Sequence, residues 1–239
     1  MVYGVWCMVY GVWCTVYGVR CMVYKWHPNG CFFCVKIGKY LHMSIFCCTF
    51  ARFLDLYMNI IKTPIEGLLV IEPQVFKDAR GYFVETYNEQ RYREAGIEAQ
   101  FVQDNQSCSS YGVVRGLHFQ RPPYSQAKLV CCTVGRVLDV AVDLRKGSPT
   151  FGKWYSVELS EDNKRQFFIP RGFAHGFSVL SNQAIFTYKC DNLYHPEADG
   201  GLLLSDPDLA IDWQVPAELR IISDKDKKHP KMAEFDSPF

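Results

Sequence analysis

The chain has 239 residues, of which 49% are hydrophobic and 21% are charged, and its formal net charge is +1. This balance is typical of a globular protein that is long enough for one sizeable domain. A dedicated nucleic-acid-binding protein would be strongly basic, so this composition argues against that class of protein.

The first 57 residues differ from the rest of the chain. They hold seven of the 11 cysteines, five basic residues and one acid, whereas residues 58–239 hold four cysteines, 21 basic residues and 24 acids. They open with the repeat MVYGVWC, MVYGVWC, TVYGVRC and MVYKWHP. Its period of seven does not predict a coiled coil, because valine, tyrosine and glycine are poor helix formers. We therefore predict a boundary at Met58, with an extension over residues 1–57 and a functional domain over residues 58–239.

Three interpretations of the extension stay open. The first is a segment without an evolved role, outside the functional domain, and it is the one we favour. The second is a membrane or targeting segment, since the first 19 residues carry no charge, but no basic stretch or cleavage pattern accompanies them. The third is a metal or redox element at Cys31 and Cys34, although the adjacent Cys47 and Cys48 supply no second C-x-x-C pair.

From Met58 onward the chain predicts many short strands and few helices. Runs rich in valine, isoleucine, phenylalanine and tyrosine are separated by glycine, proline, aspartate and asparagine; they lie at 68–76, 81–87, 99–104, 112–120, 128–144, 153–160, 165–170, 176–181 and 183–190. The best helix candidate runs from Asn88, as N-cap, to Ile97. Strands without intervening helices predict an all-β domain, an antiparallel sandwich or barrel such as a jelly roll, with a loop-rich tail after residue 209.

One predicted strand carries polar residues toward the interior. In RGLHFQ, a period of two places His118 and Gln120 on one face and Leu117 and Phe119 on the other. Polar residues on the inner face of a barrel indicate a lined pocket rather than a dry core. A return strand beginning at Lys128 would bring that lysine close to His118. His118 could be a metal ligand, an acid–base catalyst or a structural histidine.

A second stretch, IPRGFAHGF, has the spacing P-x-G-x-x-H and ends on His175. This spacing resembles the second half of the cupin signature, whose first half supplies metal ligands through H-x-H and a glutamate. Here the first half reads HFQ, with Gln120 in place of the second histidine and no glutamate soon after. Two histidines and an amide hold a first-row metal ion poorly, so we predict a metal-free pocket in which His118 transfers protons. A structural role is the alternative for His118 and, more strongly, for His175.

Taken together, the motifs of residues 58–239 resemble the dTDP-4-dehydrorhamnose 3,5-epimerase family, a metal-free cupin family. The similar motifs occur in one order and are FKDARGYFVETYN, FVQDN, RGLHFQ, KLV, VGRVLDVAVDLRKGSPTFGKW, NKRQFFIPRGFAHGF, TYKCDNLY and SDKD. The resemblance implies an isomerase without a cofactor that acts in the cytoplasm on a dTDP-sugar in dTDP-L-rhamnose synthesis. It implies His118 as base, Asp226 as its partner, Tyr188 as opposing acid and Lys128 as the group that stabilises an enolate.

The resemblance also implies a substrate-binding set and a homodimer, without a nucleic-acid or membrane partner. The set is Phe76, Arg80, Glu85, Gln103, Asn105, Arg115, Gln120, His175 and Tyr194, with Phe76 and Arg80 reaching the partner's site. Leu204 and Ser205 depart from the family pattern of an aromatic residue and an asparagine, which raises a question about packing or nucleotide contact there. Two other functions stay open: an epimerase that inverts only C3 or only C5 of another deoxysugar, and a sugar-nucleotide-binding module without catalysis.

Overall fold

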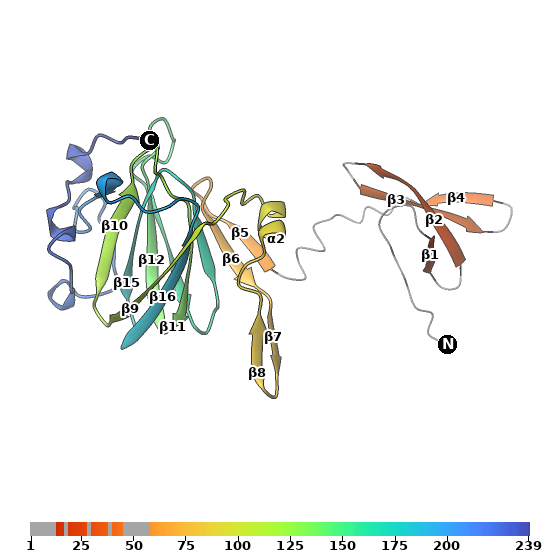
Figure 1. The fold of residues 1–239 in the computed structure, drawn as a ribbon, viewed down its shortest axis with the longest axis horizontal. Coiled ribbons are helices and arrows are strands. Elements are labelled where there is room, and N and C mark those ends of the chain that lie inside the picture. The colour runs from red at the N-terminus through yellow and green to blue at the C-terminus, as the bar shows by residue number, and fades with distance from the viewer. Residues whose placement is uncertain (1–12, 17–18, 28–29, 38–39, 45–57) are drawn as a thin grey trace. The chain divides into compact units, whose positions relative to one another are not determined.

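A computed structural model describes residues 13–16, 19–27, 30–37, 40–44 and 58–239 (Figure 1). The chain divides into two units, residues 1–57 and residues 58–239. In the first unit four strands form an antiparallel sheet in the order β1-β2-β3-β4, with bounds Trp13–Val16, Val19–His27, Gly30–Ile37 and Tyr40–Ser44. Cys31 and Cys34 belong to β3, but their side chains, like Cys47 and Cys48 altogether, lie outside what the structure describes. The role of the extension therefore stays a prediction.

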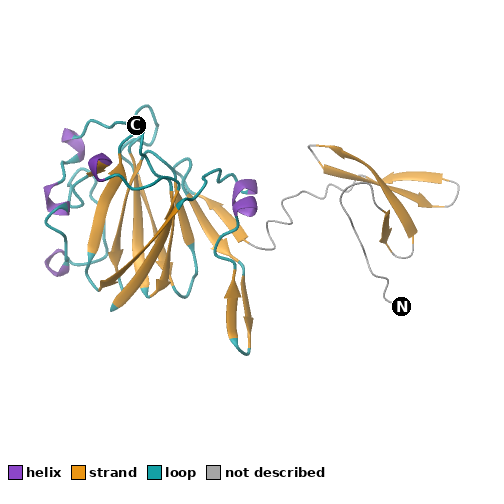
Figure 2. Cartoon of the chain, viewed as in Figure 1, coloured by secondary structure: helices purple, strands orange, loops and turns teal. Residues whose placement is uncertain are grey.

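Residues 58–239 form two antiparallel sheets and a separate hairpin (Figure 2). The five-stranded sheet has the order β13 (Trp154–Ser160), β12 (Arg136–Asp143), β15 (Phe173–Val179), β10 (Val114–Gln120) and β17 (Asp199–Gly201). The six-stranded sheet has the order β5 (Met58–Lys62), β6 (Leu69–Pro73), β14 (Gln166–Ile169), β11 (Lys128–Val134), β16 (Gln183–Cys190) and β9 (Gln103–Ser110). The hairpin pairs β7 (Val75–Asp78) with β8 (Gly81–Val84). This arrangement confirms the predicted all-β jelly-roll class.

Helical structure is sparse in this unit. The helix α2 (Glu89–Glu94) is shorter than predicted, but its N-cap is the expected Asn88, whose side chain accepts a hydrogen bond from the Arg91 N–H. The remaining helices are single 3₁₀ turns: η1 (Pro196–Ala198), η2 (Ala217–Leu219), η3 (Asp226–Lys228) and η4 (Met232–Glu234). No helix among the described residues is long and apolar enough to cross a membrane.

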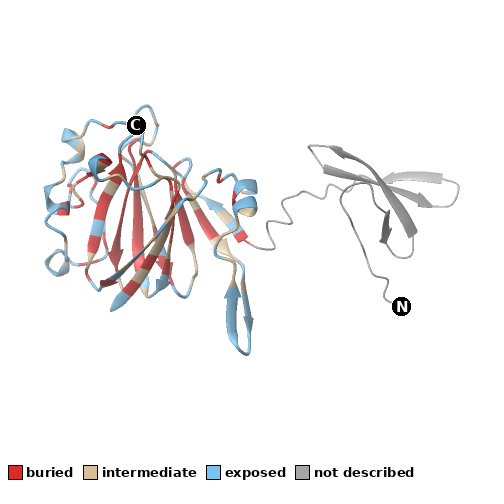
Figure 3. Ribbon diagram, viewed as in Figure 1, coloured by how far each residue is buried: buried red, intermediate tan, exposed pale blue. Residues whose placement is uncertain are grey.

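The hydrophobic core has two layers on either side of the five-stranded sheet. One cluster fills the space between the two sheets and includes Val130, Ala141 and Phe186. The other covers the outer face of the five-stranded sheet, where Trp213 and other residues after β17 pack against β10, β12 and β15. The predicted loop-rich tail therefore seals one sheet face. Figure 3 shows buried strands through both sheets, whereas the β7–β8 hairpin is exposed.

Several strands differ from the predicted runs: β5 lies outside them, the run 68–76 divides between β6 and β7, and β9 and β17 are strands without an apolar pattern. β9 covers residues 103–110 rather than 99–104, and its sequence, QDNQSCSS, is almost entirely polar. It pairs with β16 at the edge of the six-stranded sheet, where its backbone needs hydrogen bonds but few of its side chains need to be apolar. β17 contains Asp199, Gly200 and Gly201, and it forms because it pairs with β10. Neither strand carries the apolar alternation on which the sequence prediction depends.

A buried carboxylate closes the loop after β12. Asp143 accepts hydrogen bonds from the Arg145 guanidinium at 2.8 Å and from the Ser148 and Thr150 hydroxyls, each at 2.7 Å. Burial alone would raise the pKa of Asp143, but these hydrogen bonds outweigh it and hold the pKa at about 2. The carboxylate is thus stabilised in the folded protein relative to the unfolded chain.

We expect Asp143 to make the domain acid-sensitive. Because its folded pKa lies below the unfolded value of about 3.9, it contributes roughly 2 kcal/mol above pH 4, and this contribution is lost as the pH falls toward 2. In Asp143→Asn, the fall in the free energy of unfolding over that pH range should be shallower than in the wild type, as measured by denaturant titration. Asp236→Asn is the matched control, since Asp236 is exposed. Equal pH slopes in wild type and Asp143→Asn would contradict the assignment.

Candidate functional site

An irregularity in β10 brings Arg115 to the same side of the strand as His118. Arg115 pairs with Phe177 and His118 pairs with His175, so β10 has one more residue than β15 between these two pairs. This bulge turns Arg115 and His118 into the same cavity, which the simple period of two would not do. Gly116 has φ +132° and lies so close to β15 that a Cβ here would come within 2.6 Å of the Gly176 Cα. Only glycine fits at this crossing.

Asp226 holds the His118 ring from the tail. Its Oδ1 lies 2.8 Å from His118 Nε2, and its Oδ2 accepts a hydrogen bond from the Gly116 N–H at 3.3 Å. The Asp226 N–H in turn donates to Ser223 Oγ at 3.1 Å, which anchors η3. Burial alone would raise the pKa of Asp226, but the bonds from His118 and Gly116 lower it overall. An ionised Asp226 requires the proton on Nε2, which leaves the lone pair of Nδ1 available in the neutral ring.

Lys128 and Tyr188 come from the opposite sheet. Lys128 begins β11 and Tyr188 lies on β16, and both line the same two cavities as His118, of about 310 Å³ and 210 Å³. Lys128 Nζ lies 5.9 Å from the centre of the Tyr188 ring. The sequence correctly placed Lys128 near His118, but the two face each other across the interior rather than as neighbours in a hairpin. Burial lowers the pKa of the Lys128 ammonium and raises the pKa of the Tyr188 phenol.

His175 is tied to a buried aspartate. Its Nε2 lies 2.9 Å from Oδ2 and 3.1 Å from Oδ1 of Asp139, a residue that the sequence analysis did not single out. Burial lowers the pKa of His175 and raises the pKa of Asp139, so the charged form of each group is disfavoured. His175 still lines the larger cavity together with His118, Lys128 and Arg115. The structural and the substrate-binding interpretations of His175 are therefore both compatible with its position.

Polar side chains line the smaller cavity. Gln120 Oε1 accepts a hydrogen bond from the His195 N–H at 2.8 Å, which fixes the amide, and its buried Nε2 has no hydrogen-bond partner among residues 58–239. Gln103 accepts the Tyr194 N–H at 3.0 Å and donates to Asn105 Oδ1 at 3.1 Å. The Tyr194 ring is half exposed. An amide donor held without a partner in a cavity is suited to an acceptor oxygen of a ligand.

The structure thus brings together most of the predicted site residues. They are Gln103, Asn105, Arg115, His118, Gln120, Lys128, His175, Tyr188, Tyr194 and Asp226. Gln126 and Asp199, which were not predicted, also line the smaller cavity. Lys225 forms an ion pair with Asp199. No sequence motif indicated Asp199, because its place depends on the pairing of β17 with β10.

Three predicted residues lie outside these cavities within one chain. Phe76 lies on β7, and Arg80 lies in the turn of the hairpin, where its side chain is 89% exposed and pairs with Asp78. Glu85 forms an ion pair with Arg91. None of the three lines the His118 cavities. A role for Phe76 and Arg80 at a substrate site therefore requires a second copy of the chain.

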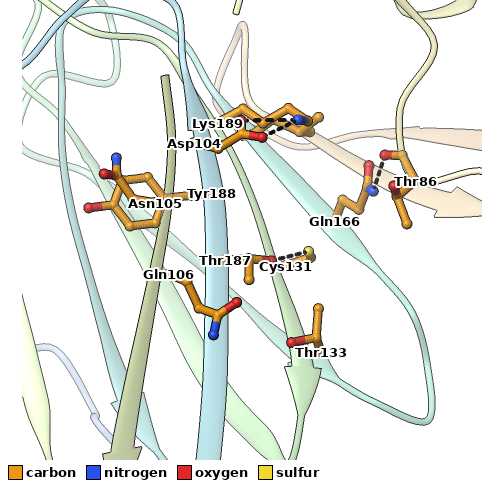
Figure 4. A pocket seen from close by; sticks show the side chains of 11 residues that line it. Thr86, Asp104, Asn105, Gln106, Cys131, Thr133, Gln166, Thr187, Tyr188 and Lys189 are labelled. Atoms are coloured by element: carbon orange, nitrogen blue, oxygen red, sulfur yellow. Dashed lines mark hydrogen bonds and ion pairs between the residues drawn. The ribbon is translucent and has the colours of Figure 1, made fainter. Parts of the chain in front are cut away.

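A further cavity, of about 330 Å³, opens on the other face of the six-stranded sheet (Figure 4). Cys131 and Thr133 of β11 line it, because they alternate with Lys128, Val130 and Cys132, which face the interior. In Figure 4 Asn105 and Tyr188 lie together at one side of it, away from Gln166 and Thr86. The charged groups Lys189 and Asp104 are paired at 2.9 Å. Tyr188 lines this cavity as well as the inner ones, whereas His118 and Lys128 line only the inner cavities.

The departures at Leu204 and Ser205 concern packing. Leu204 is 2% exposed within the outer core cluster, and its carbonyl accepts a hydrogen bond from Trp213 Nε1 at 2.8 Å. Ser205 is exposed, and neither residue lines the two His118 cavities. Within one chain, therefore, Leu204 contributes to the core and neither position contacts the cavities where the nucleotide would bind.

The side chains that lie close enough to share a metal ion differ from the pair of histidines considered from the sequence. The sequence considered His118 with His175, yet His175 Nε2 is bonded to Asp139. Among the described residues, ligand atoms of His118, Asp226 and His229 lie within 4.8 Å of one another. His229 follows η3, and its side chain is 12% exposed.

Comparisons with known proteins identify the family of this chain. The profile of the dTDP-4-dehydrorhamnose 3,5-epimerase family matches residues 62–234. The chain is 54% identical over 177 residues to the enzyme of that name from Methanothermobacter thermautotrophicus, covering 73% of this chain and 94% of the relative. It is 53% identical over 180 residues to the one from Shigella flexneri, covering 75% and 98%.

A solved structure is similar over the same region. It is the dTDP-6-deoxy-D-glucose-3,5-epimerase from Legionella pneumophila in complex with dTDP-4-keto-L-rhamnose, with 51% identity, a TM-score of 0.73, and coverage of 75% of this chain and 95% of that one. The family profile spans well over half of the chain, and the sequence and structural matches cover nearly the whole length of each relative. The chain belongs to the dTDP-4-dehydrorhamnose 3,5-epimerase family.

Proposed function

We propose that this protein inverts C3 and C5 of dTDP-4-dehydro-6-deoxy-D-glucose to give dTDP-4-dehydro-L-rhamnose, a step of dTDP-L-rhamnose synthesis. One observation carries the mechanism: His118 and Tyr188 project from opposing sheets into the same cavities. Inversion at carbon needs a proton to leave one face of the sugar and another to arrive from the opposite face. A base and an acid on facing walls meet that requirement.

His118 acts as the base through Nδ1. The C4 ketone of the substrate acidifies the hydrogens on C3 and C5, and Nδ1 takes one of them, leaving an enolate. The resulting imidazolium is stabilised by the ionised Asp226, which lies 2.8 Å from Nε2. Tyr188 then delivers its phenolic proton to the carbon from the other face. Its raised pKa keeps the phenol protonated at neutral pH until that step.

Lys128 stabilises the enolate oxygen. Its side chain lines the same cavities as His118 and Tyr188, where a nearby cation attracts a developing negative charge more strongly than it would in water. His175, held by Asp139, lines the same wall and is placed to contact the sugar.

We expect Lys128→Ala to lower turnover by about a hundred- to thousandfold, because the charge on the C4 oxygen appears only as the C–H bond breaks. The Michaelis constant should change much less, since Arg115 remains for the diphosphate. Steady-state kinetics of the epimerisation will measure both constants. Lys146→Ala serves as control, because Lys146 is exposed, pairs with Asp236 and does not line the inner cavities. An effect confined to the Michaelis constant would move Lys128 to a binding role.

The rest of the cavity binds the nucleotide and sugar. Arg115 suits the diphosphate, because a guanidinium donates two parallel hydrogen bonds to paired oxygens. Its Nε and Nη2 are held by Ser109 Oγ at 3.2 Å and 3.1 Å. Tyr194, half exposed beside the smaller cavity, is placed to flank the thymine, and Gln103, Asn105 and the unpartnered Gln120 amide supply polar contacts.

The protein works as a homodimer in which the hairpin reaches the partner's site. The β7–β8 hairpin is exposed and carries large apolar side chains: Phe76 is 47%, Tyr82 is 57% and Phe83 is 68% exposed. Such a patch on an isolated chain indicates a protein contact. In this assembly Phe76 and Arg80 complete the partner's substrate site. Glu85 follows β8 and pairs with Arg91, and it does not line the substrate cavities of its own chain.

The function is tested by incubating the protein with the dTDP-sugar in D₂O and following the products by NMR. Deuterium at both C3 and C5 with inverted configuration supports the proposal. Inversion at one carbon alone would identify a single-carbon epimerase of another deoxysugar, and binding without any exchange would identify a non-catalytic binding module. A cytoplasmic location, expected from the family, stays a prediction.

We expect a protein that starts at Met58 to keep its activity. All groups of the site, and the residues matched by the family, lie after Tyr57. Turnover within about twofold of the full chain, with an unchanged oligomeric state in analytical ultracentrifugation, is the expected result. Loss of activity or solubility on truncation would show that residues 1–57 belong to the functional unit.

A further inference from the structure

His229 gives the catalytic pair a third metal-ligating group that the proposed proton transfer does not use. Its Nε2 is buried, has no hydrogen-bond partner among residues 58–239, and lies 3.8 Å from Asp226 Oδ1. The His118 and His229 rings stand nearly perpendicular, with centroids 5.9 Å apart. A side chain at position 201 would come within 2.5 Å of His229 Nε2, so Gly201 leaves the space that this histidine occupies.

We propose that His118 Nε2, Asp226 Oδ1 and His229 Nε2 form an inhibitory site for a divalent transition-metal ion such as Zn²⁺. Two imidazoles and one carboxylate are a donor set that zinc accepts, with a fourth position left for water. The proposal rests on the proposed function in one respect only: inhibition presupposes that His118 is the base. Binding of the metal does not depend on it.

The three ligand atoms lie within 4.8 Å of one another, so a metal ion can be bound after side-chain movements of up to about 1.5 Å. With metal–ligand bonds of 2.0–2.1 Å, two tetrahedral ligand atoms lie about 3.3 Å apart. The His118 Nε2 to Asp226 Oδ1 distance of 2.8 Å would open by about half an ångström, and the His229 Nε2 to Asp226 Oδ1 distance of 3.8 Å would close by about the same amount. The Asp226 carboxylate is already held through Oδ2 by the Gly116 N–H, which fixes the orientation of Oδ1.

The local charges allow a cation here. His229 Nε2 is buried and has no hydrogen-bond partner among residues 58–239, so it is available to a metal ion. The Asp226 carboxylate, 2.8 Å from His118 Nε2, supplies an oxygen ligand of opposite charge to the metal. Lys225 would oppose a metal ion, but it forms an ion pair with Asp199.

Metal binding would switch off the base. A metal ion on Nε2 displaces the proton that His118 shares with Asp226. The neutral ring then carries its proton on Nδ1, so neither nitrogen has a lone pair with which to accept a substrate proton. The metal thus competes with catalysis directly, and removing it restores the His118–Asp226 hydrogen bond.

The test uses the full chain after treatment with a chelator, and three variants. Calorimetry with Zn²⁺ and absorption spectroscopy with Co²⁺ measure binding; deuterium exchange with the dTDP-sugar measures activity. Wild type should bind Zn²⁺ and lose at least about 90% of its exchange activity at saturation, with full recovery on adding chelator. His229→Gln should exchange deuterium normally without metal, bind Zn²⁺ at least about tenfold more weakly at this site and resist inhibition. His118→Asn should lose the same binding event, and His195→Gln is the control histidine.

The outcomes separate the proposal from its alternatives. The 11 cysteines of the chain can bind Zn²⁺ elsewhere, so the difference between wild type and His229→Gln is what counts. Co²⁺ at the proposed site should show tetrahedral d–d bands that vanish in His229→Gln, without the sulfur charge-transfer band of a cysteine site. Equal binding or equal inhibition in wild type and His229→Gln would overturn the proposal. A metal-free protein that binds Zn²⁺ as expected but exchanges no deuterium would instead refute the proposed function.

Discussion

Replacing His118 by alanine should abolish deuterium exchange at both C3 and C5 of the dTDP-sugar. Neither proton can leave without a base, and the loss of a positioned general base typically costs about 10²- to 10⁴-fold in rate. NMR of the substrate recovered from D₂O measures exchange at each carbon separately. Nucleotide binding should persist, because Arg115, Gln103 and Asn105 remain, and calorimetry with dTDP will verify that the variant is folded.

Two further variants make this assignment sharper. His118→Asn keeps a side chain that can hydrogen-bond to Asp226 but cannot accept a proton, and it should be as inactive as the alanine variant. Asp226→Asn keeps the base but removes the ionised partner 2.8 Å from Nε2, so its exchange rate should fall between the two extremes. Exchange that survives at both carbons in His118→Ala would contradict the role of His118 and that of the strand that carries it.

Tyr188→Phe should separate proton removal from inversion. His118 remains, so deuterium should still enter with retained configuration, while formation of the inverted product falls by about 10²- to 10⁴-fold. The phenylalanine ring keeps the packing of Tyr188 against the inner core, so the fold should tolerate the change. The measurement is the ratio of exchange to inversion at C3 and C5, obtained from one NMR time course.

Tyr111→Phe is the matched control, because Tyr111 is 40% exposed and does not line the inner cavities. It should leave the ratio of exchange to inversion unchanged. If Tyr188→Phe lowers exchange and inversion equally, then Tyr188 positions the substrate or assists the base. If the variant inverts both carbons at the normal rate, another donor supplies the second proton.

The position of Asp226 illustrates what a tail contributes to this site. Residues after β17 cover the outer face of the five-stranded sheet with Trp213 and its neighbours, and that packing carries η3 to the side of β10. The carboxylate thereby meets a histidine 108 positions earlier in the chain. Substitutions in the outer core are therefore expected to affect catalysis through the orientation of the His118 ring.

Residue type and spacing predicted much of this protein. The alternation of apolar residues predicted the strands that face the core, such as β10 and β16, because burial selects side chains with a period of two. Asn88 predicted the start of α2, since capping is a local interaction. Ordered motifs such as RGLHFQ, TYKC and SDKD indicated the family and its chemistry without any knowledge of their arrangement in space.

The tertiary structure decided the rest. The polar β9 and the short β17 are strands only because a neighbouring strand completes their hydrogen bonds, which no local pattern encodes. The bulge at Gly116 turns Arg115 and His118 into one cavity, against the simple alternation. Asp139 and Asp199 join the site, and His229 lies beside Asp226, through contacts between distant segments. Sequence determines which groups can do the chemistry, whereas their meeting depends on long-range packing, because only the folded sheets bring those segments together.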